Sequence, residues 1–439
     1  MQNRSSQPRT IRVTALQLPA HGRNEFHQAW PHVLASIDEA TAQGAQLLVL
    51  PEGTVPAYVL GNQGVDVAEV RAAVEDVQER ARHSKCVIVF GAARVHLGKT
   101  FNSAYVVDSD GSIAGVADKH FLWHFDRKWF EAGRELQPVH TSLGTLGVLI
   151  CADGRIPLVA HRLVQAGANI LVMPTAWVTS GRDPNQLENI QADLLACVRA
   201  RENGVPFVAA NKVGVEAQCV AYCGKSQIIE RDGSTIGLAS QHDPQILSAS
   251  LEIRSAVRVR QLESDFLQAR RASSVSLRIA LLTDAQHLAG SLSAIVADTD
   301  ADIVVGPAQL GRDSLEKRGV GAAFVGDERL LDPAGLIGYK QAGYQLIVWE
   351  AQCESPWQVR FARTRALELR LYVIVLDTAR HRAYAVDPDG AVVCGTFDDY
   401  RVAAFSFNGL RTSETLVAPH TDVLEGLSRA ALAAGNQAR

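Results

Sequence analysis

Short apolar runs alternate with longer segments of helical spacing over the first 250 residues. The apolar runs lie at 11–16, 47–52, 86–94, 147–151 and 170–174, and VPFVAAN follows at 205–211. Because their apolarity is continuous, they predict strands that are buried on both faces of a sheet. Segments 26–43, 67–83, 158–167 and 185–203 have apolar residues at helical spacing and predict helices, two of them ended by Gly44 and Gly167.

Two hairpins complete this pattern. Asp110-Gly111 separates the runs FNSAYVV and IAGVAD, and Asp232-Gly233 separates SQIIE from STIG. An Asp-Gly pair between two strand-like runs is typical of a tight β turn. Strands that alternate with helices, together with hairpins, predict an α/β fold in which a mixed sheet is layered against helices.

Residues 277–415 repeat the order of these elements in a weaker form. The matching pieces are LRIAL, ADIVVGP, QAG with QLIVWEAQ, RALELRLYVIVLD and AVDPDG. We interpret this as an internal duplication. The alternative is that two α/β domains merely share the same patterning. The predicted domains are 1–265 and 275–415, joined by a charged helix or linker at 255–275.

Composition narrows the class of protein. The 439 residues carry a net charge of −4, without a basic stripe, so neither nucleic acid nor an anionic membrane surface is expected as a partner. The first residues, MQNRSSQPRT, have no apolar core, and no run is long enough to span a bilayer, so we expect a cytoplasmic protein. Seven scattered cysteines indicate neither a disulfide framework nor a metal site, although Cys219 and Cys223 are close in sequence.

Three residues have the placement of catalytic groups. Cys151 ends an apolar run and enters a turn before a helix, where N–H groups would favour a thiolate and an oxyanion. Glu52 ends a buried strand, which suits a general base with a raised pKa. Lys119 lies among apolar residues and suits a cation that stabilises negative charge. Each has an ordinary alternative: a structural cysteine, a loop glutamate and a strand-edge lysine.

Taken together and in this order, these segments resemble the carbon–nitrogen hydrolase (nitrilase) family over residues 10–250. The matching segments are LLVLPEG, DKHFLW, GVLICADGRIP, GANILVMPTAW and RARENGVPFVAANKVG. The resemblance implies a four-layer α-β-β-α sandwich, which the smaller α/β repeat follows. It also implies a Glu-Lys-Cys triad: Glu52 takes the thiol proton, Cys151 attacks the substrate carbon, and Lys119 with the N–H of Ala152 stabilises the oxyanion. No metal or organic cofactor is implied.

Other residues near these motifs are candidates for the site. Family members often carry a second glutamate between the lysine and the cysteine; here Asp126 and Glu131 are available, and we favour Asp126 because it is closer to Lys119. Trp123, His124 and Trp177 either line the substrate pocket or pack in the core. Asp153 and Arg155 are expected to hold the turn after Cys151.

The resemblance implies a small-molecule amide as substrate. Nitrilases usually have Trp-Glu after the cysteine, whereas Ala152-Asp153 stands here, so we expect an amidase that releases ammonia or an amine. An N-carbamoyl hydrolase and a nitrilase are the alternatives. An alternative of another class is a catalytically silent binding or regulatory protein on the same fold.

The second repeat is expected to be catalytically degenerate. Pro307-Ala308 replaces Pro51-Glu52, and the stretch before its QAG segment is too short for counterparts of Lys119 and Cys151. Family members commonly pair as dimers, so we expect a homo-oligomer or an internal pseudo-dimer in which the second copy takes a partner's place.

Overall fold

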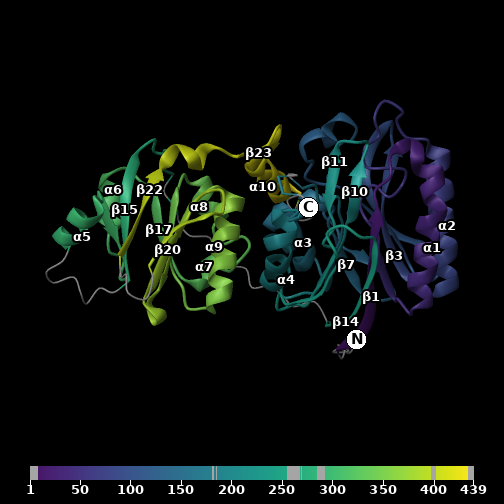
Figure 1. The fold of residues 1–439 in the computed structure, drawn as a ribbon, viewed down its shortest axis with the longest axis horizontal. Helices are drawn as coiled ribbons and strands as arrows, with labels where there is room; N and C mark the ends of the chain where they lie inside the picture. Colours follow the sequence, from purple (N-terminus) through teal and green to yellow (C-terminus); the bar gives the residue numbers. More distant parts are fainter. Residues whose placement is uncertain are drawn as a thin grey trace. The chain divides into compact units, whose positions relative to one another are not determined.

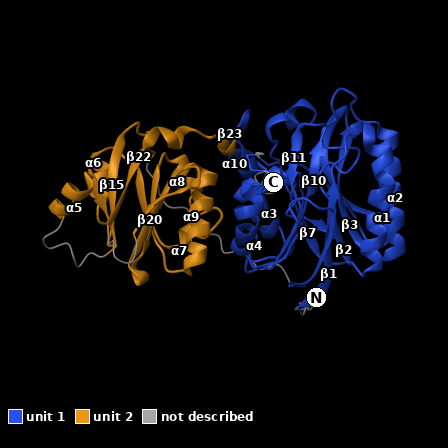
Figure 2. Ribbon diagram, in the orientation of Figure 1, with its two compact units in different colours: residues 1–259, 418–421, 425–439 blue, residues 260–417, 422–424 orange. Residues whose placement is uncertain are grey.

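The computed structural model describes residues 8–179, 182–183, 185–254, 267, 269–283, 292–396 and 402–433. The chain divides into two compact units (Figure 2). The first comprises residues 1–259, 418–421 and 425–439, and the second comprises 260–417 and 422–424. Most of the predicted linker at 255–275 lies outside the described residues.

Two sheets form the centre of the first unit. The larger has the order β11-β10-β1-β2-β3-β4-β5, with β14 also paired to β1, and the smaller has the order β13-β12-β9-β8-β7-β6. The larger sheet consists of β1 (Arg9–Pro19), β2 (Leu47–Val49), β3 (Val87–His96), β4 (Lys99–Val107), β5 (Ile113–Asp118), β10 (Lys212–Glu216), β11 (Val220–Cys223) and β14 (Gln245–Ile253). The smaller consists of β6 (Val139–His140), β7 (Thr145–Val148), β8 (Ile170–Pro174), β9 (Phe207–Ala210), β12 (Gln227–Ile229) and β13 (Thr235–Leu238).

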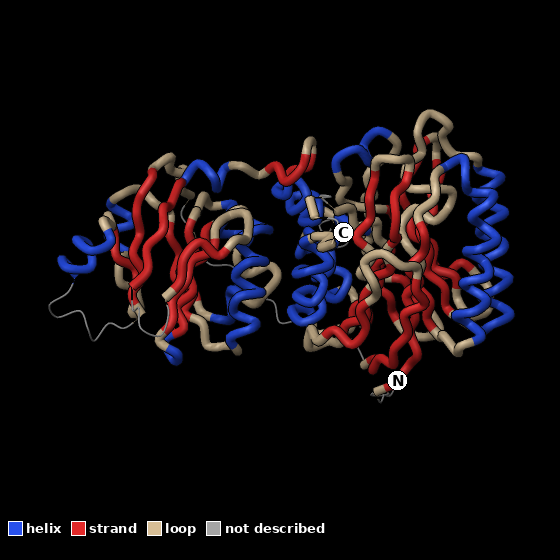
Figure 3. Tube along the Cα trace, viewed as in Figure 1, coloured by secondary structure: helices blue, strands red, loops and turns tan. Residues whose placement is uncertain are grey.

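Helices cover the outer faces of both sheets. Helices α1 (Phe26–Ala42) and α2 (Val67–Ser84) lie against the larger sheet, while α3 (Pro157–Gln165) and α4 (Ala196–Asn203) lie against the smaller one (Figures 1 and 3). The sheets face one another, with β1, β2 and β3 against β8 and β9. The result is the four-layer α-β-β-α sandwich of the nitrilase-like fold. Because each central strand is covered on both faces, runs such as LLV of β2 are apolar throughout.

The helical spacing of apolar residues explains how α1 and α2 pack on the larger sheet. Trp30, Val33 and Ile37 of α1 are buried in one core cluster with Val74 and Val77 of α2. The two helices therefore turn the apolar stripe recognised in the sequence towards the larger sheet. Gly111 and Gly233 have φ of 84° and 87°, so both Asp-Gly hairpins form where they were predicted.

Two predicted elements are corrected by the structure. The strand predicted at 147–151 lies at 145–148, because the N–H of Ile150 donates to the Asp153 side chain (3.0 Å) instead of continuing the ladder. The helix predicted at 185–203 is shorter: a single π turn, Gln191–Leu195, precedes α4. The side chain of Asn189 accepts from the N–H of Gln191 (3.0 Å), which is how an asparagine begins a helix rather than continues one.

The second unit contains two smaller sheets. One has the order β16-β15-β22 and the other β17-β18-β19-β20-β21. The strands are β15 (Ser276–Leu282), β16 (Ile303–Val305), β17 (Ala322–Val325), β18 (Leu346–Glu350), β19 (Tyr372–Asp377), β20 (Arg382–Val386), β21 (Val392–Gly395) and β22 (Val402–Asn408). The helices are α5 (Leu292–Thr299), α6 (Arg312–Lys317), α7 (Asp327–Leu330), α8 (Ile337–Gln341) and α9 (Ser355–Leu369). Its core joins Leu281 and Val305 to Leu346, Tyr372 and Phe405.

After the second unit the chain forms a small hairpin and a final helix. These are β23 (Leu416–Ala418), β24 (Thr421–Asp422) and α10 (Val423–Leu432). Residues 418–421 and those from 425 onward group with the first unit, which the sequence analysis did not anticipate. Within the described part of the chain, no helix is both long and apolar enough to cross a membrane.

Candidate active site

Four buried polar side chains meet beyond the ends of three strands in the first unit. Glu52 follows β2, Lys119 follows β5, and Cys151 follows β7. Asp126 comes from a short 3₁₀ turn, His124–Lys128. The side chains of Glu52, Lys119 and Asp126 are completely buried, and Cys151 is 7 % exposed. Groups of this kind are rarely placed in a core unless they interact with one another.

Lys119 binds both carboxylates. Its Nζ lies 2.7 Å from Glu52 Oε1 and 2.7 Å from Asp126 Oδ2. Burial by itself lowers the pKa of Lys119, but Asp126 and Glu52 reverse this effect and hold that pKa well above its ordinary value. Lys119 is therefore a fixed positive charge between two carboxylates.

Glu52 keeps one oxygen free for a proton. Its Oε1 accepts from Asn102 Nδ2 (2.6 Å) as well as from Lys119, whereas Oε2 has no hydrogen-bond partner among the described residues. Burial raises the pKa of Glu52, and this effect outweighs the opposing charge of Lys119. A carboxylate with a raised pKa and a free oxygen suits a general base.

Tyr58 holds the second carboxylate in place. Its hydroxyl donates to Asp126 Oδ1 (2.7 Å), and the backbone N–H of Trp123 donates to Asp126 Oδ2 (2.8 Å). Glu131, the other candidate, lies at an exposed position 3.4 Å from Lys99. The structure thus brings Asp126 to Lys119 and leaves Glu131 on the surface.

The turn after Cys151 is strained and tied to the Lys119 loop. Cys151 has φ of 44°, in the left-handed region that a residue with a Cβ rarely adopts. The side chain of Asp153 accepts from the N–H groups of His120 (3.0 Å) and Phe121 (2.7 Å), and also from Ile150 (3.0 Å). One carboxylate therefore joins the backbone next to Lys119 to the backbone next to Cys151. Ala152, the proposed oxyanion donor, is buried in the same turn.

The Cys151 thiol is neutral without help from a base. Burial raises its pKa to about 12; Glu52 raises it further, while Lys119 lowers it. The hydroxyl of Thr175 and the N–H of Ala176 face the sulfur and also lower this pKa. The backbone N–H of Glu52 donates to the carbonyl of Thr175 (3.3 Å), which links the base to the strand end beside the thiol.

Two arginines support the same turn in different ways. Arg199 of α4 is buried, pairs with Glu202 (2.6 Å), and donates through Nε to the carbonyl of Gly154 (2.9 Å). Arg155 stacks its guanidinium over the ring of Trp123 at 4.4 Å. Among the described residues, the Arg155 guanidinium has no hydrogen-bond or ion-pair partner.

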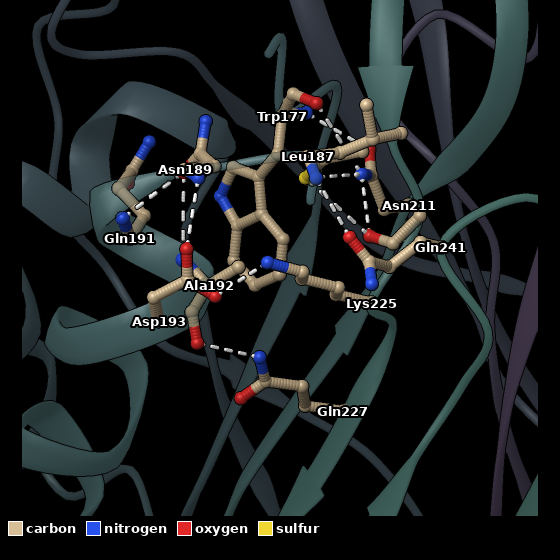
Figure 4. A network of polar contacts seen from close by, with 12 residues as sticks. Trp177, Leu187, Asn189, Gln191, Ala192, Asp193, Asn211, Lys225, Gln227 and Gln241 are labelled. Atoms are coloured by element: carbon tan, nitrogen blue, oxygen red, sulfur yellow. Dashed lines mark hydrogen bonds and ion pairs between the residues drawn. The ribbon is translucent and has the colours of Figure 1, made fainter. Parts of the chain in front are cut away.

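The remaining predicted pocket residues differ in exposure. Trp123 and His124 are half-buried, and the His124 ring packs edge-on against Phe125. Trp177 is completely buried, and its backbone N–H donates to Asn211 Oδ1 (2.8 Å). Figure 4 shows Trp177 within a polar network that includes Asn189 and Lys225. This network ties segment 187–193 to residue 178 and to segment 225–241. The pairs are Leu187–Gln241, Asn189–Val178, Lys225–Asp193 and Gln227–Ala192.

A second buried ion pair supports the loop after Glu52, and sequence reasoning did not find it. Lys212 Nζ binds Glu216 (2.9 Å) and the carbonyl of Gly53 (2.9 Å). Glu216 accepts from the N–H of Val59 (2.6 Å) and from the hydroxyl of Tyr222 (2.7 Å). Loop 53–59, which carries Tyr58, is thereby fixed at both ends.

Tyr58 and Asn102 were also missed. Asn102 lies inside the apolar run FNSAYVV, and a polar residue there is a sequence signal that could have indicated a buried partner. Tyr58 has no comparable signal, because a tyrosine in a loop is ordinary.

A glycine allows the strand bearing Glu52 to approach its neighbour closely. A Cβ at Gly91 of β3 would lie 2.6 Å from the Cα of Glu52 and 2.7 Å from the nitrogen of Gly53. These are backbone atoms, so the contact cannot be relieved by a rotamer change. Gly91 also bonds to this segment, donating to Pro51 (3.1 Å) and accepting from Thr54 (3.1 Å).

Known proteins resemble the first unit in sequence and fold. The carbon-nitrogen hydrolase family model matches residues 12–261, and the chain belongs to this family. This match falls almost wholly within the first unit.

Individual relatives are distant. A probable nitrilase of Schizosaccharomyces pombe is 28% identical over 230 residues, which is 51% of this chain and 82% of the relative. An (R)-stereoselective amidase of a Pseudomonas species is 29% identical over 53% of this chain and 82% of its own length. The structure of a carbon-nitrogen hydrolase from Helicobacter pylori has a TM-score of 0.50 at 25% identity, covering 55% of this chain and 89% of that one.

Substitution of Gly91 by alanine should impair the site without removing any polar group. The added Cβ forces the Glu52 backbone to shift, and a displacement of about 1 Å in a catalytic group costs about 100-fold in rate. We therefore expect Gly91→Ala to lower kcat/KM by about 10- to 100-fold. Gly237→Ala in β13 is the matched control, since its new Cβ meets a flexible leucine side chain at 3.3 Å. Equal activity of both variants and the wild type would contradict the expected role of Gly91.

Proposed function

We propose that the chain is a cysteine-dependent amidase that hydrolyses a non-peptide carbon–nitrogen bond through a thioester intermediate. The observation that carries this proposal is the buried cluster of Glu52, Lys119, Asp126 and Cys151, in which Glu52 keeps a free carboxylate oxygen. A purely structural network would be expected to satisfy that oxygen.

The geometry supports a first step in which proton transfer and attack occur together. With a pKa of about 12, the Cys151 thiol is protonated near neutral pH, so Glu52 must remove its proton as the sulfur attacks the amide carbon. The oxyanion that forms is stabilised by Lys119 and by the backbone N–H of Ala152. Because Lys119 is held by two carboxylates, it presents its charge without reorganisation.

The second half of the reaction returns the site to its starting state. Glu52 passes the thiol proton to the nitrogen of the leaving group, so that ammonia or an amine departs and the acyl group remains on sulfur. Glu52 then removes a proton from water, and the hydroxide attacks the thioester carbon. The acid product leaves, and Cys151 regains a proton. Asp126 acts throughout by keeping Lys119 charged and oriented.

A second candidate is an N-carbamoyl amino acid hydrolase. Relatives with matching sequence include an N-carbamoylputrescine amidase of Oryza sativa, 26% identical over 49% of this chain and 78% of its own length. The Arg155 guanidinium interacts electrostatically with Cys151 and lacks an ion-pair partner among the described residues. A half-buried cation without an ion-pair partner favours a substrate that brings a carboxylate close to the reacting bond.

Ammonia release from a substrate panel tests the proposed activity. The panel pairs simple amides with amides that bear a carboxylate, and adds N-carbamoyl amino acids and nitriles. We expect at least one amide or carbamoyl compound to be hydrolysed, and Cys151→Ala to reduce this rate by about 10⁴-fold or more. Arg155→Met should selectively weaken hydrolysis of the compounds with a carboxylate.

Thiol labelling distinguishes an enzyme from a silent binding protein. Fluoroacetamide or iodoacetamide should label Cys151 in the wild type and much more slowly in Glu52→Gln, whereas the exposed Cys219 should react equally in both. A Cys151 that is inert in the wild type, together with no hydrolysis of any compound, would favour the binding protein.

We also propose that residues 275–415 are a degenerate second copy of the hydrolase fold. The order β16-β15-β22 matches β2-β1-β14 of the first unit, and β17 to β21 match β7-β8-β9-β12-β13. The registers support this correspondence. Leu146 pairs with Ile170, and Ala322 pairs with Leu346, each pair being 24 residues apart in sequence.

One buried ion pair recurs in both units. Arg365 of α9 pairs with Glu368 (2.9 Å) and donates through Nε to the carbonyl of Leu330 (2.8 Å). Arg199 makes the same pair with Glu202 and the same bond to Gly154. Two unrelated α/β domains have no reason to share this arrangement.

The catalytic side chains have no counterparts in this copy. In the proposed correspondence Asp327 occupies the place of Cys151, and it accepts from Trp349 Nε1 (2.9 Å). This replaces the expectation that the whole Cys151 segment is missing. Ala308 takes the place of Glu52, and the stretch between β16 and β17 is too short for the strands that precede Lys119.

Matched substitutions of the two arginines test the duplication. Arg199→Met and Arg365→Met each leave a buried glutamate without this partner, and each should cost about 3–5 kcal/mol of stability in its own unit. Only Arg199→Met should also reduce activity per folded molecule, because Gly154 adjoins the nucleophile turn. Hydrogen exchange followed by mass spectrometry locates the loss of protection, and hydrolysis reports the activity. If Arg365→Met destabilises nothing, the two pairs are not equivalent.

The expected internal pseudo-dimer stays a prediction, and the state of association of the full chain tests it. Sedimentation velocity should give a single monomeric species over a range of concentrations, because the second copy would replace a partner subunit. A stable dimer or larger assembly of full chains would instead favour the homo-oligomer.

A further inference from the structure

The end of the chain lies against the loop that carries Asp126. Residues 418–421 and 425 onward belong to the first unit, although residues 260–417 intervene. In this segment Thr421, Leu427 and Ala430 are buried. The segment is therefore packed against the hydrolase unit rather than extended in solvent.

Thr421 makes the most specific contact. Its hydroxyl accepts from the backbone N–H of His124 (2.7 Å) and donates to the carbonyl of Pro419 (3.2 Å). His124 has φ of 40°, an unfavourable conformation for a residue with a Cβ, which persists only when its surroundings hold it. Glu425 adds an exposed ion pair to Arg127 (3.3 Å) on the same loop.

Gly426 brings the last helix close to both catalytic segments. A Cβ at this position would lie 2.6 Å from Ile156 Cδ1 and 2.7 Å from the Phe121 ring. Phe121 is two residues from Lys119, and Ile156 ends the turn that begins at Cys151. Helix α10 thus packs on the two segments that Asp153 ties together.

The contacted loop sets the position of Asp126. The N–H of Trp123, next to His124, donates to Asp126 Oδ2, the oxygen that binds Lys119. If His124 loses its acceptor, the strained turn can relax, and Asp126 moves with it. A shift of Asp126 changes the orientation of Lys119 and hence the stabilisation of the oxyanion.

We propose that residues 418–421 and 425–432 are a positioning element of the active site, with Thr421 as its principal contact. This inference rests on the proposed function. The hydrolase unit is thus completed by residues at the far end of the chain, after the second unit, and Thr421 acts through the His124 turn rather than on substrate.

The test compares four variants of the full chain. Thr421→Val keeps the shape but removes the acceptor, and Gly426→Ala adds a Cβ that forces the Phe121 and Ile156 side chains to shift. Thr421→Ser keeps the hydroxyl, and Ser428→Ala changes an exposed position of the same helix. We measure the rate at which fluoroacetamide labels Cys151, by peptide mass spectrometry, together with kcat and KM on the best amide. Thermal unfolding reports whether each variant is folded.

The positioning role predicts a specific pattern. Thr421→Val and Gly426→Ala should lower kcat and the labelling rate by about 10-fold or more with little change in KM, whereas Thr421→Ser and Ser428→Ala should behave like the wild type. If folded Thr421→Val reacts like the wild type, or if Thr421→Ser is impaired as strongly as Thr421→Val, the inference is overturned. Should Thr421→Val not fold, the Gly426→Ala rates decide in the same way. A Cys151 that is unreactive in the wild type contradicts the proposed function instead.

Discussion

The structure of the first unit depends on one buried charge arrangement, in which Lys119 lies between Glu52 and Asp126. Removing three charged groups from water is costly unless they compensate one another and their remaining polar atoms are satisfied. Asn102, Tyr58 and the N–H of Trp123 provide that satisfaction, and each comes from a different segment. The free Oε2 of Glu52 is the one exception among the atoms of these three groups in the described structure. A site of this kind tolerates little displacement, because a shifted partner leaves an uncompensated charge.

The scaffold meets this demand by joining backbone segments through side chains. Asp153 links the N–H groups beyond Lys119 to the one that precedes Cys151, and Arg199 holds the same turn from α4. In the same way, Lys212 and Glu216 hold the loop after Glu52, through the carbonyl of Gly53 and the N–H of Val59. The strand ends from two different sheets are therefore fixed relative to one another by buried polar contacts. Apolar packing alone would align the layers without fixing the positions of individual carbonyl and N–H groups.

Comparison of the two units indicates which polar side chains the fold needs and which only the proposed reaction needs. In the proposed duplication, the Arg–Glu pair and the strand registers persist where the nucleophile and the base do not. The pair stabilises a helix and the turn beneath it, a purpose that survives the loss of catalysis. In the first unit the same pair also adjoins Cys151. In this proposal, the Arg–Glu pair kept in both units satisfies backbone carbonyls, whereas the unpartnered Glu52 oxygen has no counterpart in the second unit.

The sequence pattern predicted helices and strands correctly where apolar residues alone determine which face is buried. Continuous apolar runs indicated β2, β3 and β8, helical spacing indicated α1 and α2, and Asp-Gly pairs marked both hairpins. The motifs around Glu52, Lys119 and Cys151 were recognisable because each of these residues lies within three residues of the end of a strand. The end of β7 and the start of α4 were misplaced, since side chains of Asp153 and Asn189 take backbone N–H groups that periodicity assigns to a strand or a helix.

Tertiary structure alone decided that Asp126 rather than Glu131 reaches Lys119, that Tyr58 and Asn102 complete the cluster, and that Thr421 contacts His124 from 297 residues away. The physical reason is that patterns along a chain report burial, whereas the partner of a buried polar atom depends on which distant segments the layers bring together.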